Sequence, residues 1–342
     1  MKPFVSIIIP YYKGKDFIRN FSLPSILNQK YDNYEVCIID DGSQDDVEEI
    51  INKFKKENKE KDIRYFKSVI NKGLGWAYNF GIKMAKYEYV AFLEQDDIWL
   101  PNKLEEQIEF METKNLLASS TWCFELDLNS KKIIDIHIGA LSGFIAKKKF
   151  FEIVGFFDEN KSMLGAQDAD LYMKFLISVY KKNIPSSTFY IFEKPLFIFV
   201  RHPGSLSSRS GNIVNIINRY KSLLEKYKMY EDINYKEIKN LISYWQSHLA
   251  VNYCLINKNA EAKKILIKSL KMKKSPIILM LYIFSSFPSN FWQLIYILWQ
   301  HIKKIKGLAK IQIYKLKFRN ELMLAIKLIK NIPTTNVRNN IS

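Results

Sequence analysis

The stretch YEYVAFLEQDDIWLPNKL, residues 87–104, joins an apolar run to a cluster of acidic and amide side chains. Residues 89–93 are all apolar, which is typical of a strand buried on both faces of a sheet. The next four residues are Glu94, Gln95, Asp96 and Asp97. Carboxylates at the edge of a buried sheet can hold a hard divalent cation, and such a cation can neutralise a diphosphate. The stretch therefore predicts a buried strand that ends at a ligand site.

Three similar apolar runs precede this strand, at residues 4–9, 35–39 and 63–68. Segments with helical spacing lie between the runs, and Pro24 in the first of these segments predicts that its helix begins near Ser22. The segment 44–58 has acids in its first turn and lysines in its last turn, which suits the helix macrodipole. The alternation of strand and helix predicts a Rossmann-like, mostly parallel sheet.

Polar residues follow each predicted strand, at Pro10-Tyr11-Tyr12, Asp40 to Ser43, Asn71 to Gly73 and residues 94–97. Ligands of such sheets bind beyond the carboxyl ends of the strands, so these residues should lie together. A simpler interpretation, that Asp40 and Asp96 are turn or cap residues, stays open. The chain has no G-x-G-x-x-G after the first strand and no P-loop motif, which argues against a dinucleotide fold and a P-loop enzyme.

The net charge of +17 is unevenly distributed. Residues 1–210 hold 29 basic and 29 acidic residues, whereas residues 211–342 hold 23 and 6. This difference predicts a globular domain over 1–210 and a helical, basic region over 211–342 that meets an anionic partner. Three widely spaced cysteines and the lack of a signal-peptide pattern at the N-terminus favour a cytoplasmic location.

A run from Ser275 to His301 contains no Asp, Glu, Lys or Arg and is flanked by lysines. The sequence SSFPSN divides the run into two segments that are each too short to cross a bilayer. We expect an interfacial or re-entrant hairpin, held by Trp292 and Trp299 at the inner face of an anionic membrane. An internal hairpin of a soluble helical domain is the alternative. No nucleic-acid-binding motif accompanies the basic charge, so we expect no nucleic-acid partner.

Four ordered blocks within residues 3–205 carry a family resemblance: VSIIIPYYKGKDF, NKGLGWAYNFGIKMAKYEYVAFLEQDD, LSGFIAKKKFFEIVGFFDE and GAQDADLYMKFL. They resemble the signature blocks of the inverting family 2 glycosyltransferases with the A-type fold. The resemblance implies transfer of a sugar from a nucleotide-sugar donor, a UDP-sugar, to a hydroxyl of a cell-surface glycan or a lipid-linked oligosaccharide. Capsule and lipopolysaccharide are the expected products, and Mn²⁺ or Mg²⁺ is the expected cofactor.

The resemblance also implies roles for individual residues. The nucleotide would be bound by Pro10, Tyr12, Asp41, Asn71 and Asp96, with Tyr12 stacking on the uracil and Asp41 accepting from it. Asp97 and Asp96 would be metal ligands, His202 a weaker candidate ligand, and Arg201 a group that offsets phosphate charge. Asp168 matches the general base that takes the acceptor's proton. Two simpler interpretations stay open: Asp168 or Asp170 caps a helix, and His202 is a surface residue.

The sequence departs from the family pattern at three positions. Glu94 stands where the first aspartate of the acidic block is usual, Tyr78 replaces an arginine, and Gln167 replaces the glutamate before the base. These departures motivate a second interpretation, a catalytically silent subunit that binds sugar nucleotides or organises a glycan assembly complex. The retention of Asp97 and Asp168 favours the enzyme.

Overall fold

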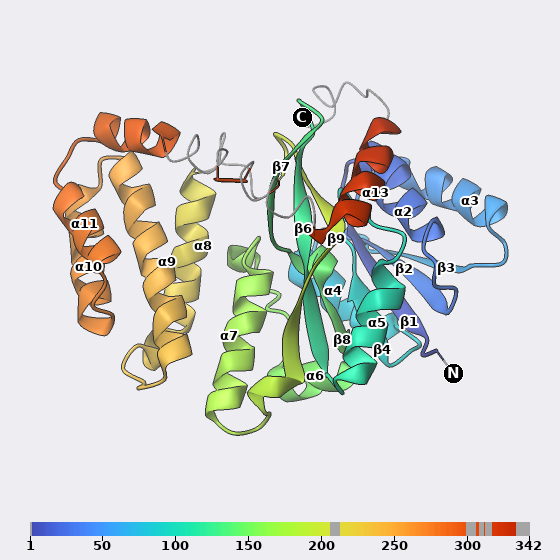
Figure 1. Ribbon diagram of the computed structural model, residues 1–342, viewed down its shortest axis with the longest axis horizontal. Coiled ribbons are helices and arrows are strands. Elements are labelled where there is room, and N and C mark those ends of the chain that lie inside the picture. Colours follow the sequence, from blue (N-terminus) through green and yellow to red (C-terminus); the bar gives the residue numbers. More distant parts are fainter. Residues whose placement is uncertain (1, 206–212, 299–305, 308–310, 312–316, 333–342) are drawn as a thin grey trace. The chain divides into compact units, whose positions relative to one another are not determined.

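The computed structural model describes residues 2–205, 213–298, 306–307, 311 and 317–332. The chain forms two compact units (Figure 1). The sheet unit comprises Met1–Lys161, Pro185–Ser205 and Lys306–Ser342, and the helical unit comprises Ser162–Ile184 and Leu206–Ile305. This division differs from a single boundary at residue 210, because residues 162–184 join the helical unit and the C-terminal segment returns to the sheet unit.

The predicted parallel strands are all present in the sheet unit. They are β1 (Val5–Tyr11), β2 (Tyr34–Asp40), β3 (Asp62–Lys67) and β4 (Tyr89–Phe92), in the order β3-β2-β1-β4. All three pairings are parallel. Pairing of β1 with β4 ends at Ile8 and Phe92, so Pro10, which has no N–H to donate, lies beyond it.

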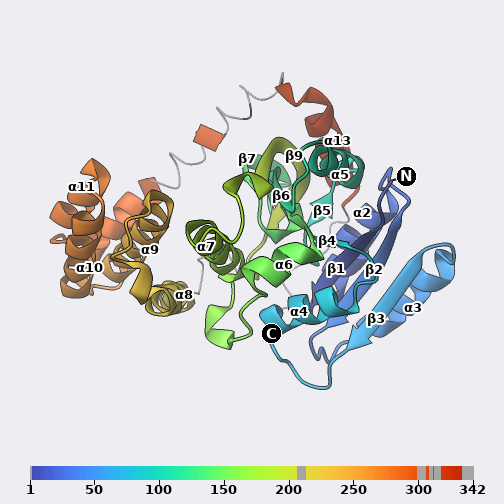
Figure 2. The ribbon, with the colours of Figure 1, turned by 90° about the horizontal axis from the view of Figure 1, so that it is seen from below.

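Helices cover both faces of these strands (Figure 2). Apolar side chains of α3 (Val47–Glu57) and α5 (Lys103–Thr113) share one core with the odd-numbered residues of β1. Helices α4 (Leu74–Met84) and α6 (Lys148–Val154) lie on the opposite face. Close packing of α4 requires Gly81, because a Cβ there would lie 2.4 Å from Ile8 Cγ2.

The first helical segment is built from three consecutive pieces. The chain is helical from α1 (Lys15–Phe17) through a π-helical turn (Ile18–Ser22) into α2 (Leu23–Leu27). Leu23 donates its N–H to the Ile18 carbonyl, five residues back. The α-helix α2 has Ser22 as its N-cap and Pro24 in its first turn, so the prediction of a start near Ser22 is confirmed. The π-turn before it keeps the preceding residues helical where the proline lacks a donor.

The second half of the sheet is mixed. Strands β5 (Ile98–Trp99), β6 (Ala118–Asp127), β8 (Ile145–Lys147) and β9 (Phe189–Arg201) extend it in the order β4-β8-β6-β9-β5, and β7 (Lys132–Ile138) pairs with β6. β8 is antiparallel to β4 and β6, whereas β9 is parallel to β6. A 3-10 turn (Leu141–Gly143) precedes β8.

Helix α13 (Arg319–Lys330) completes the core of the sheet unit. Its side chains Leu322, Ala325 and Ile329 form a buried cluster with strands β6 and β9. Glu321 also pairs with Lys194 of β9 at 2.9 Å. This helix was predicted as part of the basic C-terminal region, but its apolar face packs on the sheet.

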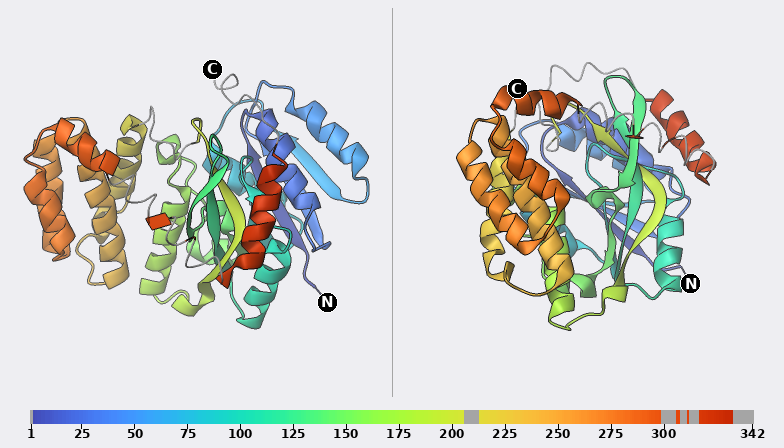
Figure 3. Two further views of the ribbon diagram at one scale, coloured as in Figure 1. Left: turned by 45° about the horizontal axis from the view of Figure 1, so that its top comes forward. Right: turned by 60° about the vertical axis from the view of Figure 1, so that its left-hand side comes forward.

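The helical unit consists of α7 (Gln167–Tyr180), α8 (Ile213–Lys226), α9 (Lys236–Leu255), α10 (Asn259–Met272), α11 (Pro276–Phe284) and a helical segment over residues 289–298. Figure 3 shows α8, α9 and α10 packed side by side. The described part of the chain contains no helix with the length and apolar character needed to span a bilayer.

The charge-free run folds into α11, a turn and the segment 289–298, while residues 299–301, including Trp299, lie outside the described residues. Trp292 is 3% exposed and donates its indole N–H to the Phe284 carbonyl at 3.1 Å. The expectation of Trp292 as a membrane anchor was therefore wrong, because its ring fastens the two helical segments together and packs among residues of α9 and α10.

Candidate active site

The ends of β1 and β4 are joined by Gln95. Its side-chain carbonyl accepts the Tyr12 N–H at 3.0 Å, and its amide donates to the Lys13 carbonyl at 2.6 Å. Pro10 is buried and registers with Ile39 of β2, whereas the Tyr12 ring is 46% exposed. The acidic segment after β4 thus fixes the backbone that presents Tyr12 to solvent.

The two aspartates after β2 have different environments. Asp40 accepts the Ser43 N–H at 2.7 Å and the Tyr65 hydroxyl at 2.5 Å, which is the turn role considered as the simpler interpretation. Asp41 is 4% exposed and accepts the backbone N–H groups of Lys72 and Gly73, both at 2.7 Å. Burial raises the pKa of Asp41, although these two hydrogen bonds oppose the rise.

Positive charge gathers beside Asp41. Asn71 is half-buried, and its carbonyl accepts the Lys161 ammonium at 3.0 Å. Lys72 places its ammonium 4.5 Å from the centre of the Trp76 ring. The loop after β3 therefore brings the predicted residues Asp41 and Asn71 together with two lysines.

Asp96 and His202 meet although they lie 106 residues apart in the chain. His202 Nε2 is 2.9 Å from Asp96 Oδ2. The imidazole is 5% exposed and stacks on Phe17 at 4.3 Å between ring centres, so its orientation is fixed. The Asp96 side chain is 25% exposed and can be reached from solvent. The structure thus brings together two predicted metal ligands, a carboxylate and an imidazole.

Asp97 points into the protein instead. It is 1% exposed, and its oxygens accept the Ser142 hydroxyl at 2.5 Å and the Val200 N–H at 3.0 Å. Burial and the neighbouring Asp96 charge hold the pKa of Asp97 well above its usual range. Asp97 is buried and both of its oxygens already accept protein donors, whereas Asp96 can be reached from solvent, so this geometry favours Asp96 over Asp97 as the carboxylate ligand.

Ser142 is a functional candidate that the sequence reasoning missed. Its hydroxyl donates to Asp97 and accepts the Glu94 N–H at 3.0 Å. Its carbonyl accepts the Trp99 indole N–H at 2.7 Å. A fully buried serine at the centre of these contacts fixes the acidic segment from three sides. The only sequence signal was a small polar residue before a glycine in the LSGF block.

Two of the three departures from the family pattern contact each other. The Tyr78 hydroxyl donates to Glu94 Oε1. Tyr78 is fully buried on α4, where its ring packs against Phe92 and Phe157 with centres 5.3 and 4.7 Å apart. Replacing an arginine by Tyr78 and an aspartate by Glu94 therefore creates one hydrogen-bonded pair beside Asp96.

The Arg201 guanidinium is paired within the protein. It forms an ion pair with Glu125, whose side chain is 2% exposed and also lies 3.0 Å from His137 Nε2. An arginine that already balances a buried carboxylate has little charge left to offset a phosphate.

Asp168 lies in the helical unit, near the start of α7. Asp168 is an exposed residue whose carboxylate accepts the Ala169 N–H at 2.7 Å. Desolvation by the surrounding protein raises the pKa of this carboxyl, and the Ala169 hydrogen bond and the Arg219 charge oppose the rise. The N-cap residue of α7 is Ala166, so neither Asp168 nor Asp170 occupies the cap position. Asp170 is fully buried and bonds to Lys226 at 2.5 Å, to Tyr227 at 2.6 Å and to Lys174 at 2.9 Å. Asp170 therefore ties α7 to α8, and Gln167 beside Asp168 is buried.

The protein offers a divalent cation two side-chain donors rather than a complete cage. No group of three or more His, Cys, Asp or Glu side chains suited to a metal occurs among the residues that the structure describes. Asp96 and His202 supply one oxygen and one nitrogen, from the segments that follow β4 and β9. Such a pair suits a cation whose remaining ligands come from a substrate and water.

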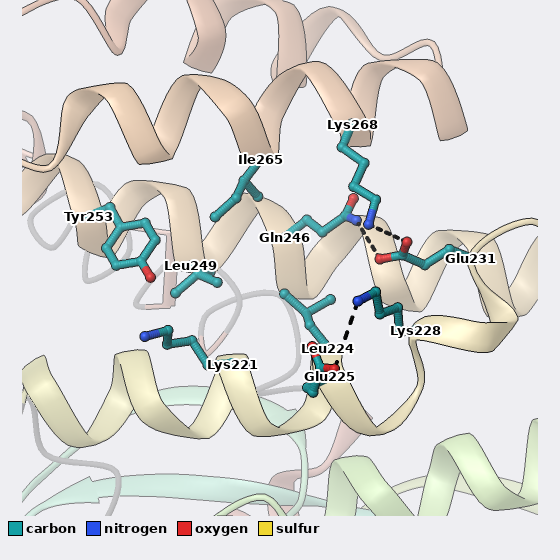
Figure 4. Close-up of a pocket in the computed structure, with 10 residues that line it drawn as sticks. All are labelled: Lys221, Leu224, Glu225, Lys228, Glu231, Gln246, Leu249, Tyr253, Ile265 and Lys268. Atoms are coloured by element: carbon teal, nitrogen blue, oxygen red, sulfur yellow. Dashed lines mark hydrogen bonds and ion pairs between the residues drawn. The ribbon is translucent and has the colours of Figure 1, made fainter.

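A separate pocket of about 520 Å³ lies in the helical unit between α8, α9 and α10 (Figure 4). Its lining combines Leu224, Leu249 and Ile265 with paired charges such as Lys268 on Glu231. It shares no residue with the strand-end site.

Comparison with known proteins shows which proteins this chain resembles. Residues 6–169 match the sequence pattern of the family Glycosyl transferase family 2. An uncharacterized glycosyltransferase of Rickettsia bellii is 42% identical over 144 residues, which cover 42% of this chain and 20% of that protein. A UDP-Glc:α-D-GlcNAc-diphosphoundecaprenol β-1,3-glucosyltransferase of Escherichia coli is 43% identical over 124 residues, which cover 36% of this chain and 47% of that enzyme. The chain thus spans less than half the length of either relative.

A mannosyltransferase of Pyrobaculum calidifontis, solved with GDP-mannose and Mn²⁺, has a similar fold, with a TM-score of 0.52. The similarity covers 97% of this chain and 86% of that one at 16% identity. The mixed sheet with helices on both faces is therefore the A-type fold seen in such enzymes. The family pattern over residues 6–169, just under half of the chain, supports a family 2 glycosyltransferase domain in this part of the protein.

Proposed function

We propose that this protein transfers a sugar, with inversion, from a UDP-sugar to a hydroxyl of a lipid-linked or cell-surface glycan. The observation that carries the proposal is the Asp96–His202 pair, at 2.9 Å, at the strand ends of a family 2 domain. A nucleoside diphosphate needs its charge neutralised where it leaves, and a cation held by this pair would supply positive charge there.

Asp96 and His202 would hold the cation that the leaving diphosphate requires. A bound divalent cation supplies Lewis-acid stabilisation of the departing phosphate oxygens. A mixed oxygen and imidazole donor set suits Mn²⁺ better than Mg²⁺, which prefers oxygen ligands alone. Support for a metal also comes from the Mn²⁺ bound to the Pyrobaculum enzyme.

The other strand-end residues would position the donor. Tyr12 offers an exposed ring for stacking on the base, and Gln95 fixes the backbone on which that ring depends. Asp41 holds the loop after β3 through its bonds to Lys72 and Gly73, and it would accept a hydrogen bond from the base with its remaining lone pairs. Asp97, through Ser142 and Val200, would keep Asp96 in place.

Asp168 is our candidate for the general base. Its carboxylate is exposed, whereas that of Asp170 is occupied by two lysines and a tyrosine. A carboxylate with accessible lone pairs can accept the proton of the attacking hydroxyl, and one that is buried in ion pairs is held in its charged state by its partners. Asp168 also occupies the base position of the family blocks.

The acceptor would be lipid-linked or part of a cell-surface polysaccharide, as the name of the Escherichia coli relative states for that enzyme. An acceptor of this kind lies at a membrane, so we place the protein in the cytoplasm against the inner face of the membrane. The excess of 23 basic over 6 acidic residues after residue 210 supports attraction to anionic lipid.

A thermal-shift titration with UDP, with and without Mn²⁺, tests the donor and metal assignment. Saturating UDP and Mn²⁺ should stabilise the protein by about 2.7 kcal/mol at a hundred times the dissociation constant. Asp96→Ala should lose the part of this stabilisation that depends on Mn²⁺, whereas Asp97→Asn should retain that part. Asp62→Ala, at the start of β3, is the control for losing a carboxylate. If GDP or CMP stabilises the protein and UDP does not, the donor assignment is wrong.

The second candidate function is a catalytically silent subunit that binds sugar nucleotides, and the altered positions Glu94, Tyr78 and Gln167 favour it. An enzyme should hydrolyse one member of a UDP-sugar panel slowly in the presence of Mn²⁺. A silent subunit should bind UDP without any such hydrolysis.

A further inference from the structure

The charge-free hairpin of the helical unit presents an apolar surface to solvent. Among the described residues of the hairpin, Ile278 and Trp292 are buried, several other large apolar side chains are half-buried, and a third set is between 42% and 67% exposed. We call the exposed set the hairpin patch; it consists of Ile277, Leu279, Met280, Ile283, Phe287, Leu294, Ile297 and Leu298. On α11 and on the segment 289–298 most of these positions are three or four residues apart, so they lie along one side of each helical segment, and Phe287 lies in the turn that joins them.

The opposite side of the hairpin holds it on the helical unit. Ile278 of α11 and Trp292 of the second segment are buried in the cluster that contains Leu249 and Leu266. The connecting turn is fixed by Asn259, which donates to the Phe287 carbonyl at 2.8 Å, and by Asn257, which accepts the Ser289 N–H at 3.0 Å. The orientation of the hairpin patch is therefore fixed by buried contacts and by hydrogen bonds of the turn.

Charge identifies the partner that this patch fits. The run from Ser275 to His301 carries no charged residue, and exposed Lys271, Lys273 and Lys274 stand directly before it. A second copy of the chain would bring the same lysines, and so would be repelled. Apolar side chains bordered by lysines instead match the acyl boundary and the headgroups of an anionic lipid surface.

The dimensions of the hairpin favour lying on a bilayer over crossing it. Helix α11 has 9 residues, which gives a length of about 14 Å against a hydrocarbon core of about 30 Å. We propose that the hairpin patch inserts into the headgroup and acyl boundary of an anionic membrane, with the preceding lysines on the phosphates. This assignment rests on the membrane location in the proposed function, and it names the surface that makes the contact.

Co-sedimentation with vesicles of phosphatidylcholine, with or without 30% phosphatidylglycerol, tests the proposal on the full chain. The test variant replaces four patch residues that are each more than half exposed: Ile277→Ser, Ile283→Ser, Leu294→Ser and Ile297→Ser. The matched control replaces exposed apolar residues elsewhere in the helical unit: Val214→Ser, Met229→Ser and Ile267→Ser. A third variant changes Lys271, Lys273 and Lys274 to Gln.

The parent protein should bind the anionic vesicles and retain part of that binding at high salt. The patch variant should lose at least about tenfold in partition, including the salt-resistant part, because each serine removes buried methylene groups. The control variant should bind like the parent, and the lysine variant should lose only the salt-sensitive part. Melting temperatures of all variants check that the fold is intact.

Three results would overturn the proposal: equal partition of patch variant and parent, equal loss in the control variant, or a parent that binds no vesicles and dimerises through the patch in sedimentation velocity. UDP binding is measured on the same samples. A patch variant that loses vesicle binding but still binds UDP shows an effect on membrane contact alone. A parent protein that binds vesicles but not UDP contradicts the proposed function and not the assignment of the hairpin patch.

Discussion

Tyr78→Phe removes one hydroxyl from the strand-end site and almost nothing else. The phenyl ring keeps the contacts of Tyr78 with Phe92 and Phe157, so the core of α4 should be unchanged. The loss is the hydrogen bond to the Glu94 carboxylate. A hydrogen bond to a charged group contributes about 1.5–3 kcal/mol, and a difference of about 1.4 kcal/mol is tenfold in binding.

If Tyr78 positions Glu94 for contact with the donor, loss of the Tyr78–Glu94 hydrogen bond should lower the affinity for the donor by a similar free energy. We therefore expect the donor KM to rise by about ten- to hundredfold while kcat changes much less, because Glu94 would contact the donor rather than the reacting hydroxyl. The assay is initial-rate transfer at varied donor concentration. Tyr89→Phe is the control. Tyr89 lies at the start of β4, the strand that precedes Glu94, and its hydroxyl donates to Glu112.

The control should lower the melting temperature with little change in donor KM, since the start of β4 lies at the edge of the sheet away from the site. The reasoning is refuted if Tyr78→Phe leaves donor KM unchanged, or if Tyr89→Phe raises it equally. The first outcome would make Tyr78 a packing residue, and the second would mean that any loosening of β4 reaches the donor.

Because burial raises the pKa of Asp97, its charge costs the folded state stability once the pH passes the ordinary carboxyl value of about 4. The melting temperature of Asp97→Asn minus that of the parent should therefore increase from pH 4 to pH 8, and a flat difference would contradict the raised pKa. Asp168→Asn should retain UDP binding and lose about 10²–10⁴-fold in transfer, whereas Asp170→Asn should mainly lower stability, and the reverse pattern in a transfer assay would exchange their roles. Gly81→Ala should cost about 1–3 kcal/mol in urea unfolding, because its methyl would press on the fully buried Ile8, and a neutral result would mean that α4 shifts freely.

The sequence predicted the parallel strands of the fold well and the rest poorly. Strands β1 to β4 alternate with helices, and each carries a local apolar run bounded by turn residues. Strands β6 to β9 depend on pairings between distant segments, such as β6 with β9, and no local pattern specifies such a partner. The packing of helix α13 on the sheet was not predicted for a related reason. Its lysines gave it the composition of the basic region, but its apolar stripe of Leu322, Ala325 and Ile329 fits β6 and β9.

The site could be located from the sequence, but the partners of its side chains could not. Parallel strands bring their ends together, and this placed Asp41 and Asp96 at one edge. The sequence pattern did not predict which of the two carboxylates faces inward. Asp96 is oriented by His202, which follows β9, and Asp97 is oriented by Ser142, which lies in the turn before β8. The sequence showed that Tyr78 and Glu94 depart from the family pattern. Their hydrogen bond could be found only from the structure, because it depends on how α4 packs on the sheet.

The return of α13 to the sheet unit has a consequence for synthesis on the ribosome. β9 ends at Arg201, but the helix that covers it begins only at Arg319, after the entire helical unit has been translated. At about 5–20 residues per second, the apolar face formed by Phe124, Leu126 and Ile198 would wait on the order of 10 s for its cover. Helices with local contacts fold in far less time, so the helical unit should be complete while the sheet unit is still open. A chain that stops near residue 300 would leave the ribosome with that face uncovered, so we expect α13 to be needed before the sheet unit can complete its core.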